Sequence, residues 1–389
     1  MMCTAHVFSM AGFATFPALL PTLLPLWELS NTQAGWISGI FFAGYVTAVP
    51  ILVTLTDRVD SRRIYLVGVA ISAIGLLGFA FTAGGFWSAM IWQAVQGAGI
   101  GGTYMTGLRV MTDRVPGTVP SRAIAFYTGA FSVGTALSFV LSGEIANWLG
   151  WQPTFALAAL GPIVAGAIVL LLLGARGPDA EHRPDTHLLD FRPVLHNRQA
   201  MAFTLGYFGH SWELFALRGW IVAFLVFAGA QQAGAGLFSA TLIAGAANLL
   251  AVPASIIGNE FAERFGRRRT ILTVMILTTA AAVATGFSAS VSLGAAALFV
   301  IIYSGFVMGD SASLTAGAAA AAQPGYRGAT LAVHSILGFS GALFGPLAVG
   351  LALDLDGGQA SAVAWIIAFA AMGFGSLAGA AALWRLGRS

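Results

Sequence analysis

Residues 57–83 read DRVDSRRIYLVGVAISAIGLLGFAFTA, a charged cluster at Asp57–Arg63 followed by about twenty residues without a charge. The same arrangement returns 206 residues later, where ERFGRRR at Glu263–Arg269 precedes the uncharged run 270–289. An apolar run of roughly 20 residues is long enough for a helix to cross about 30 Å of hydrocarbon. The repeated stretch therefore predicts a membrane protein built from two similar halves.

The composition of the whole chain supports a membrane protein. Of the 389 residues, 58% are hydrophobic and 8% are charged, and the mean hydropathy is +0.83, which is outside the range of soluble domains. The 49 glycines suit helices that pack closely through small residues. The short alternating segments of a membrane β-barrel are not seen. We therefore expect an all-α integral membrane fold and no soluble enzyme.

Apolar runs separated by glycine, proline or charge predict twelve transmembrane helices. They lie near 4–26, 32–55, 63–83, 86–112, 121–146, 152–174, 199–228, 234–258, 270–289, 292–318, 326–351 and 359–384. The charged, proline-bearing segment 175–197 divides them into six-helix bundles at 1–174 and 198–389, and we expect it to be a cytoplasmic linker. Because six is an even number, the bundles share one topology and are related by a pseudo-two-fold axis along the membrane normal.

The positions of the cations predict the orientation. All eighteen cationic residues are arginine, and sixteen of them fall on the side of the predicted membrane that holds both termini. The opposite loops carry Glu28, Asp354 and Asp356. Since cationic loops are retained in the cytoplasm, we expect a multi-pass protein of the inner or plasma membrane with both termini cytoplasmic.

Several classes of function are excluded or disfavoured by what the chain contains. Without lysine there is no G-x-x-x-x-G-K-[ST] nucleotide loop, so ATP-driven transport within this chain is excluded. The single Cys3 permits no internal disulfide and no cysteine metal cluster, and we expect no metal and no cofactor. No Ser-His-Asp arrangement is visible, so an enzyme is not expected. We expect the lipid bilayer as a partner, no nucleic acid, and a monomer.

The repeated loop resembles the motif G-x-x-x-D-R-x-G-R-R that follows the second helix of each half in the major facilitator superfamily (MFS). The first copy keeps Asp57, Arg58 and Arg62 but has Asp60 where glycine is usual. The matching residues of the second copy are Glu263, Arg264, Gly266, Arg267 and Arg268. The resemblance covers essentially the whole chain and implies a secondary transporter of unassigned subfamily, whose two bundles rock about a central site.

The resemblance also implies a role for the loop in gating. We expect Asp57 to sit at the positive N-terminus of the eleventh helix, and Glu263 at that of the fifth, when the cytoplasmic side closes. The gating residues are then Asp57, Arg58, Arg62, Glu263, Arg264 and Arg267. The alternative is that the arginines only enforce the orientation of the chain.

The fifth predicted helix departs from the pattern of the family's drug antiporters, G-x8-G-x3-G-P-x2-G-G. Ser138, Phe139 and Ser142 replace a glycine, the proline and another glycine. In the fourth helix, Gln93 stands at the arginine position of the pattern R-x-x-Q-G-x-G. Both departures weaken the resemblance to drug antiporters.

Ionisable residues inside a bilayer are costly and therefore mark candidate functional sites. The seventh predicted helix contains YFGHSWELFALRGW, with His210, Glu213 and Arg218. We expect Arg218 to bind an anionic group through a fork of hydrogen bonds, and Glu213 to exchange a proton with His210 as a relay. The alternative is a structural ion pair that fixes helix packing.

The fourth and tenth helices add further candidates. Asp310 is expected to pair with Arg218 or to carry the coupling proton itself. Gln93, Gln96 and Tyr104 supply neutral hydrogen bonds to a substrate or, alternatively, ordinary bonds between helices. In the resembled family the first, fourth, seventh and tenth helices line the cavity, and these polar residues cluster there.

Three functions are consistent with these residues. The leading one is secondary active transport by alternating access, a proton-coupled symport of a small organic anion. The alternative is proton-coupled efflux of drug-like or cationic compounds, with Glu213 and Asp310 as the acidic pair. The third is a non-transporting membrane sensor on the same fold.

Overall fold

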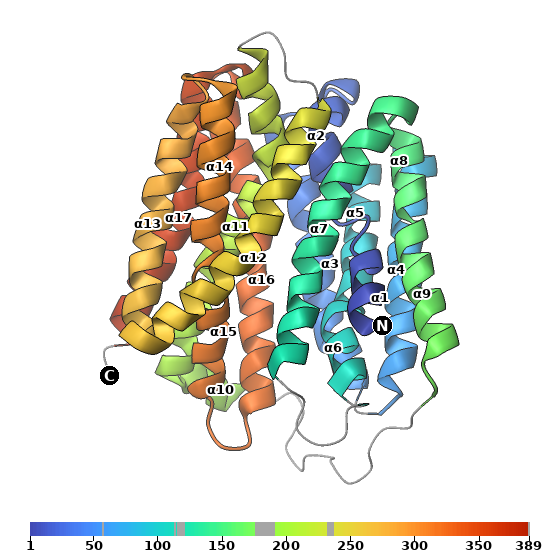
Figure 1. Cartoon of the computed structure of the whole chain (residues 1–389), viewed down its shortest axis with the longest axis vertical. Coiled ribbons are helices and arrows are strands. Elements are labelled where there is room, and N and C mark those ends of the chain that lie inside the picture. Colours follow the sequence, from blue (N-terminus) through green and yellow to red (C-terminus); the bar gives the residue numbers. More distant parts are fainter. Residues whose placement is uncertain (57, 113, 115–120, 176–190, 232–236, 388–389) are drawn as a thin grey trace. The chain divides into compact units, whose positions relative to one another are not determined.

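The computed structural model describes residues 1–56, 58–112, 114, 121–175, 191–231 and 237–387. Within these ranges every regular element is a helix, and Figure 1 shows them along the chain. The helices are α1 (Met2–Ser9), α2 (Thr15–Leu26), α3 (Asn31–Leu55), α4 (Ser61–Thr82), α5 (Phe86–Gly101), α6 (Tyr104–Thr112), α7 (Ser121–Leu149), α8 (Trp151–Ala158), α9 (Leu160–Leu172), α10 (Arg192–His196), α11 (Arg198–Ala230), α12 (Leu237–Phe265), α13 (Arg267–Ser288), α14 (Leu293–Met308), α15 (Ser311–Ala320), α16 (Arg327–Asp354), the 3-10 turn η2 (Gly358–Ala360) and α17 (Ala362–Leu386).

The twelve predicted spans correspond to these helices. Among the described residues, ten helical stretches are long and apolar enough to cross a membrane. The remaining two predicted spans, the first and the fourth, are each divided into two shorter helices, α1 with α2 and α5 with α6. Two further spans, α8 with α9 and α14 with α15, are also interrupted but are still long and apolar enough to cross.

The chain forms two compact units. Unit 1 comprises Met1–Trp27 and Ile40–Asp185, and unit 2 comprises Glu28–Gly39 and Thr186–Ser389. The predicted boundaries at 174 and 198 stay a prediction, and most of the predicted linker lies outside the described residues.

The beginning of α3 groups with unit 2 because Asp354, the last residue of α16, binds it. The Asp354 carboxylate accepts hydrogen bonds from the backbone nitrogens of Asn31 at 3.1 Å and Thr32 at 2.8 Å. The side chains of Asn31 and Thr32 also donate to it, at 2.8 and 2.6 Å. A carboxylate at a helix N-terminus satisfies free N–H groups and is favoured by the helix dipole. Asp354 therefore caps α3 from a distant part of the chain.

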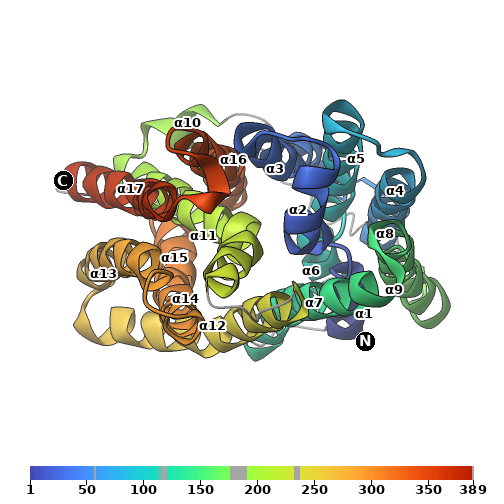
Figure 2. The same cartoon turned by 90° about the horizontal axis from the view of Figure 1, so that it is seen from above.

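In unit 2, α11 is the central helix (Figure 2). It packs against α12, α14, α15, α16 and α17. In the most apolar 18-residue stretch of α11, 89% of the residues are buried inside the protein, whereas the corresponding share in α13 is 33%. The polar residues of α11 are therefore surrounded by other helices rather than by lipid.

Glycines allow the close crossings that this arrangement needs. Gly341 and Gly345 of α16 lie directly against the backbone carbonyls of Phe208 and Trp212 in α11. In unit 1, Gly97 of α5 lies against the carbonyl of Phe41 in α3 in the same way. A side-chain carbon at any of these positions would overlap the opposing backbone. Close backbone approach supplies the dispersion contacts that hold helices together in lipid.

Side chains of neighbouring helices stabilise the interruption between α1 and α2. Gln96 Nε2 donates to the Gly12 carbonyl at 2.7 Å. Ser138 Oγ donates to the Ala11 carbonyl at 2.6 Å and accepts from the Ala14 nitrogen at 3.0 Å. Irregular backbone at membrane depth is tolerated when the freed groups are paired again in this way. Ser138, which stands where the drug-antiporter pattern has a glycine, therefore stabilises the break between α1 and α2.

The glycine contacts make a testable prediction. We expect Gly97→Ala to lower the melting temperature of the detergent-solubilised protein by several degrees, because overpacking against backbone costs about 1–3 kcal/mol. Gly129→Ala is the matched control, since a Cβ there meets nothing within 4 Å. Replacing a helical glycine that has free space with alanine should leave the melting temperature unchanged or raise it. Equal losses for both variants would contradict the packing argument.

Candidate functional site

His210 and Glu213 of α11 contact three different side chains in unit 2. His210 Nδ1 lies 2.7 Å from Asp310 Oδ1. Glu213 accepts hydrogen bonds from the Tyr303 hydroxyl at 2.9 Å and from the Ser376 hydroxyl. In this structure His210 contacts Asp310, and the relay between His210 and Glu213 stays a prediction.

The pair of His210 and Asp310 is sealed from solvent. The two side chains are 1% and 2% exposed. Asp310 occupies the interruption of the tenth predicted span, since α14 ends at Met308 and α15 begins at Ser311. A buried carboxylate and imidazole stabilise each other when they share a proton, and removing one partner leaves a costly charge.

A second histidine extends this polar region. The ring of Tyr207 stacks on the ring of His210, with centroids 5.4 Å apart, and on that of His334, at 4.4 Å. The two nitrogens of His334 lie 3.4 Å from Thr204 Oγ1 and 3.3 Å from Thr315 Oγ1. In the sequence His334 is an isolated histidine, and only the packing of α16 on α11 brings it here.

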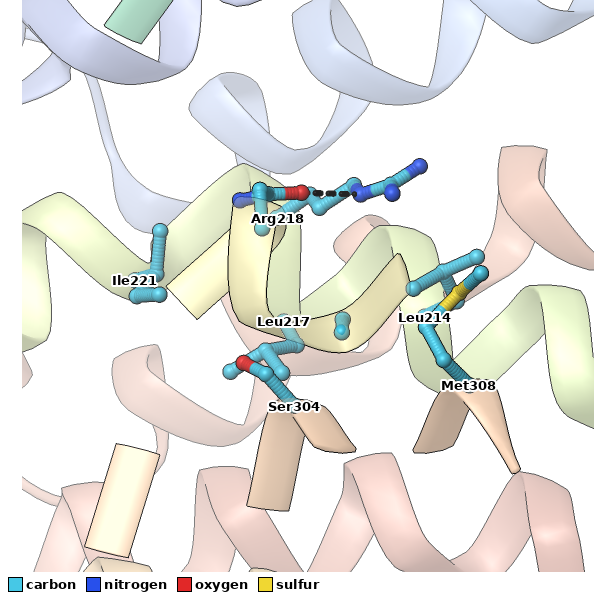
Figure 3. Close-up of a pocket in the computed structure, with 8 residues that line it drawn as sticks. Leu214, Leu217, Arg218, Ile221, Ser304 and Met308 are labelled. Atoms are coloured by element: carbon cyan, nitrogen blue, oxygen red, sulfur yellow. Dashed lines mark hydrogen bonds between the residues drawn. The ribbon is translucent and has the colours of Figure 1, made fainter. Parts of the chain in front are cut away.

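Arg218 lies on the wall of a small cavity in unit 2 (Figure 3). Its Nε donates to Asn248 Oδ1 at 2.8 Å, and its side chain is buried. The cavity measures about 10 Å³, close to the minimum for one water molecule. Its other walls are Leu214, Leu217, Ile221, Ala251, Ser304 and Met308. Asn248 was not predicted, because nothing in the sequence of α12 indicates that its amide contacts Arg218 of α11.

The three predicted neutral residues of the fourth span belong to unit 1. Gln93 and Gln96 are buried in α5, and the amide of Gln96 is bound to the Gly12 carbonyl. Tyr104 begins α6, and its carbonyl accepts a hydrogen bond from the Tyr127 hydroxyl at 3.1 Å. Gln96 thus has a clear structural role, and a direct contact with substrate stays a prediction for all three.

His6 is a candidate that sequence reasoning missed. It is fully buried in α1, and its ring stacks on Tyr127 with centroids 4.5 Å apart and on Tyr104 at 5.5 Å. The sequence does carry an indication of it, since His6 precedes His210 by 204 residues, close to the repeat offset.

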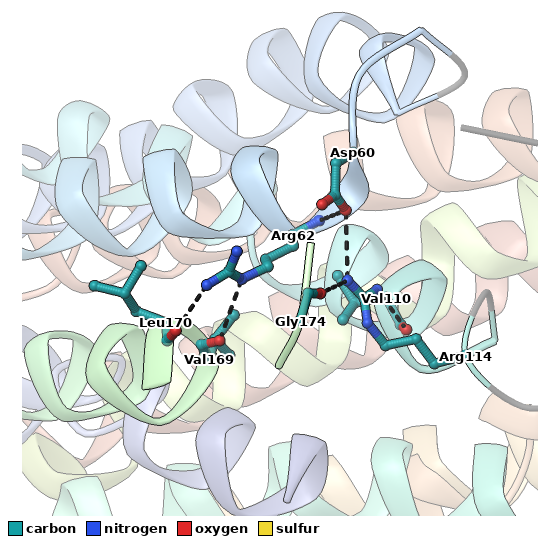
Figure 4. A network of polar contacts seen from close by, with 7 residues as sticks. All are labelled: Asp60, Arg62, Val110, Arg114, Val169, Leu170 and Gly174. Carbon is teal, nitrogen blue, oxygen red and sulfur yellow. Dashed lines mark hydrogen bonds and ion pairs between the residues drawn. The ribbon is translucent and has the colours of Figure 1, made fainter. Parts of the chain in front are cut away.

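The two copies of the repeated loop use different chemistry at one position. Gly266 precedes α13 with φ of +92°, in the left-handed region that favours glycine. The equivalent Asp60 has φ of −47° and needs no glycine; its carboxylate accepts from the Arg62 nitrogen at 2.9 Å and caps α4 (Figure 4). Asp60 also pairs with Arg114 at 3.5 Å. The departure from the motif therefore replaces a backbone turn with a side-chain cap.

The motif arginines bind the last helix of their own half. Arg62 donates to the carbonyls of Val169 and Leu170 in α9, at 3.4 and 2.7 Å (Figure 4). Its repeat partner Arg268 donates to the carbonyls of Trp384, at 2.6 Å, and Gly387. Cations near a helix C-terminus pair with its free carbonyls and its dipole.

The predicted gate itself is not tested by these contacts. Asp57 lies outside the described residues. Arg58 and Arg264 are exposed, Arg267 is half-buried, and Glu263 accepts a hydrogen bond from Asn259 of its own helix at 3.2 Å. A gating role for these residues stays a prediction.

Comparison with known proteins defines the class. A family model of the Major Facilitator Superfamily matches residues 2–346, so the chain belongs to this family. It is accordingly an all-α, multi-pass membrane transporter with twelve transmembrane helices in two bundles, and its cargo is a small molecule.

The individual proteins that the chain resembles have low sequence identity to it, between 12% and 26%. The chain is similar to YcaD, described as an uncharacterized MFS-type transporter, from Salmonella enteritidis PT4 (strain P125109), with 26% identity over 303 residues, 75% of this chain and 73% of the relative. Among solved structures it resembles a bacterial homologue of the human lysosomal transporter Spinster in an inward-facing and occupied conformation, with a TM-score of 0.78, 16% identity and coverage of 100% and 95%. It also resembles the nucleoside transporter NupG, with a TM-score of 0.74, 12% identity and coverage of 100% and 99%. At these identities the two structures support the fold alone.

The role of Gln96 can be tested directly. We expect Gln96→Leu to destabilise the detergent-solubilised protein by about 1–3 kcal/mol, because the buried Gly12 carbonyl loses its donor. Gln231→Leu, at an exposed position after α11, is the control and should have little effect. If Gln96→Leu melts like the unmodified protein, the hydrogen bond does not hold the interrupted first span.

Proposed function

We propose that this transporter moves a small organic anion by alternating access and couples the movement to protons. The observation that carries the proposal is Arg218, a buried guanidinium on the wall of a cavity in the most enclosed helix of unit 2. A guanidinium binds carboxylate or phosphate oxygens through two parallel hydrogen bonds, which is geometrically specific. The proposed location is the inner membrane, with both termini cytoplasmic.

The surroundings of Arg218 support an anion with an apolar part. Asn248 holds the guanidinium by its Nε, and the leucines, Ile221 and Met308 line the remaining wall. Because the cavity accommodates about one water in this state, binding requires it to widen, as expected for a site that alternates between open and closed forms.

The proton is proposed to reside on His210 and Asp310. Their contact at 2.7 Å is buried on all sides, so a change in protonation alters the stability of the interruption between α14 and α15. Protonation and helix arrangement are then coupled, which is what proton-driven transport requires.

The efflux alternative relies on Glu213 and Asp310 as a cation site. Glu213 uses its two oxygens to accept from Tyr303 and Ser376, and Asp310 faces His210. Both acids are thus engaged with donors of unit 2, which favours the anion over the cation as cargo.

The anion proposal is tested in proteoliposomes with a panel of carboxylates. We expect Arg218→Gln to reduce uptake at least tenfold, since a charge-assisted hydrogen bond contributes about 1.5–3 kcal/mol, and Arg218→Lys to recover only part of it. Arg385→Gln removes an exposed arginine of α17 that belongs to no proposed site, and it should transport normally. Undiminished uptake by folded Arg218→Gln protein would refute the assignment.

Proton coupling is tested by separating driven uptake from exchange. We expect Asp310→Asn to abolish accumulation driven by an imposed pH gradient while retaining exchange of internal for external substrate, because the carrier can still cycle when loaded. Asp356→Asn, at an exposed position, is the control. Accumulation by Asp310→Asn equal to that of the unmodified protein would show that the proton is carried elsewhere.

A further inference from the structure

The internal repeat reaches the buried centre of each half. Tyr104 and Asp310 are 206 residues apart, the offset that separates Arg62 from Arg268, and His6 and His210 are 204 apart. In unit 2 the histidine faces Asp310 at the interruption between α14 and α15. In unit 1 the histidine stacks on Tyr104 at the interruption between α5 and α6, with ring centroids 5.5 Å apart and planes at 26°. Equivalent positions thus carry an acid in one half and an aromatic ring in the other.

The surroundings of His6 are aromatic. Its ring stacks on Tyr127 at 13° and lies 6.2 Å from the ring of Phe131. Its Nδ1 lies 3.3 Å from Ser9 Oγ, whereas Nε2 is buried and has no hydrogen-bond partner within the described part of the chain. A buried polar nitrogen without a partner is costly, and a ligand that supplies the missing hydrogen bond is one explanation for it.

The rings around His6 differ in their roles. The Tyr127 hydroxyl donates to the carbonyls of Thr103 and Tyr104, each at 3.1 Å, and so holds the interruption of the fourth span. Tyr104 and Phe131 are only half-buried, and Phe131 is joined to the half-buried Phe13 by an edge contact at 5.1 Å. These three partly exposed rings are linked through Phe131, which contacts Phe13, Tyr104 and the imidazole of His6.

We propose that unit 1 binds an aromatic ring of the substrate on Phe13, Tyr104 and Phe131, and that His6 Nε2 forms a hydrogen bond with a polar substituent on that ring. Offset rings favour a flat aromatic partner over an aliphatic one of equal size. This inference rests on the proposed function and narrows the cargo to aromatic organic acids that carry a hydroxyl group or a ring nitrogen.

The test measures equilibrium binding of radiolabelled acids to the full-length protein in detergent. The probes are cyclohexanecarboxylate, benzoate and the three isomeric hydroxybenzoates. The unmodified protein should prefer benzoate to cyclohexanecarboxylate, and one hydroxybenzoate isomer to benzoate by about tenfold, the effect of one neutral hydrogen bond. His6→Phe keeps the ring and should abolish the second preference while retaining the first. His196→Phe changes an exposed histidine of α10 and should preserve both.

Three outcomes would overturn the proposal: equal binding of benzoate and cyclohexanecarboxylate, no preference among the hydroxylated acids, or a preference that His6→Phe leaves intact. The last result together with a higher melting temperature would mean that the unpaired Nε2 only destabilises the fold and binds no substrate. Should His6→Phe not fold, Ser9→Ala takes its place and should weaken the preference, because it removes the contact that orients the imidazole.

A comparison of the affinities for phenol and toluene, neither of which is a carboxylate, tests the aromatic site independently of anion transport. If no carboxylate is bound or transported but phenol is preferred over toluene in a manner that depends on His6, the anion proposal fails and the aromatic site stands. If carboxylates are transported but no ring or hydroxyl preference exists, the anion proposal stands and the aromatic site fails.

Discussion

The structure depends on one constraint: polar groups within the hydrocarbon must find partners inside the protein. An ionised side chain at the centre of a membrane helix costs about 2.5–3.5 kcal/mol even by the most lenient scale. The polar side chains of α11 meet this constraint because five other helices surround α11 and keep it away from lipid. His210 then contacts Asp310 between α14 and α15, Glu213 accepts from residues of α14 and α17, and Arg218 donates to Asn248 of α12. The central helix of unit 2 is therefore the most buried of the candidate spans and carries three ionisable side chains in its middle.

The same constraint applies to the backbone where spans are interrupted. Gln96 and Ser138 pair the groups freed between α1 and α2, and Tyr127 pairs those freed between α5 and α6. The interruption at Asp310 instead places a carboxylate against His210. Interruptions near the middle of a span cost regular hydrogen bonds, and two of them place the candidate side chains of Tyr104 and Asp310 at the break.

The two halves show how a repeat diverges while its frame persists. Arg62 and Arg268 bind carbonyls of the last helix in their respective halves. One residue position in the same loop has become Asp60 in the first half and Gly266 in the second, with a side-chain cap in one and a left-handed turn in the other. The centre has diverged further, into a histidine with an acid and a histidine with aromatic rings. A shared frame with different centres suits a transporter whose halves handle different parts of one task.

The sequence by itself determined the class of fold, because twenty uncharged residues in succession have few uses other than crossing a bilayer, and that property is local. It also determined which residues are costly, so His210, Glu213, Arg218 and Asp310 were all identified as candidates. The tertiary structure alone decided how they pair. Helical spacing places His210 near Glu213 on one helix, but the packing of α14 and α15 against α11 brings Asp310 into contact with His210. The same holds for Asn248 and His334, whose significance comes only from contacts between helices, whereas His6 has a weak indication in the repeat offset. Periodicity reports which faces of a helix share chemistry, whereas the helix that covers each face depends on side-chain fit between segments far apart in the sequence.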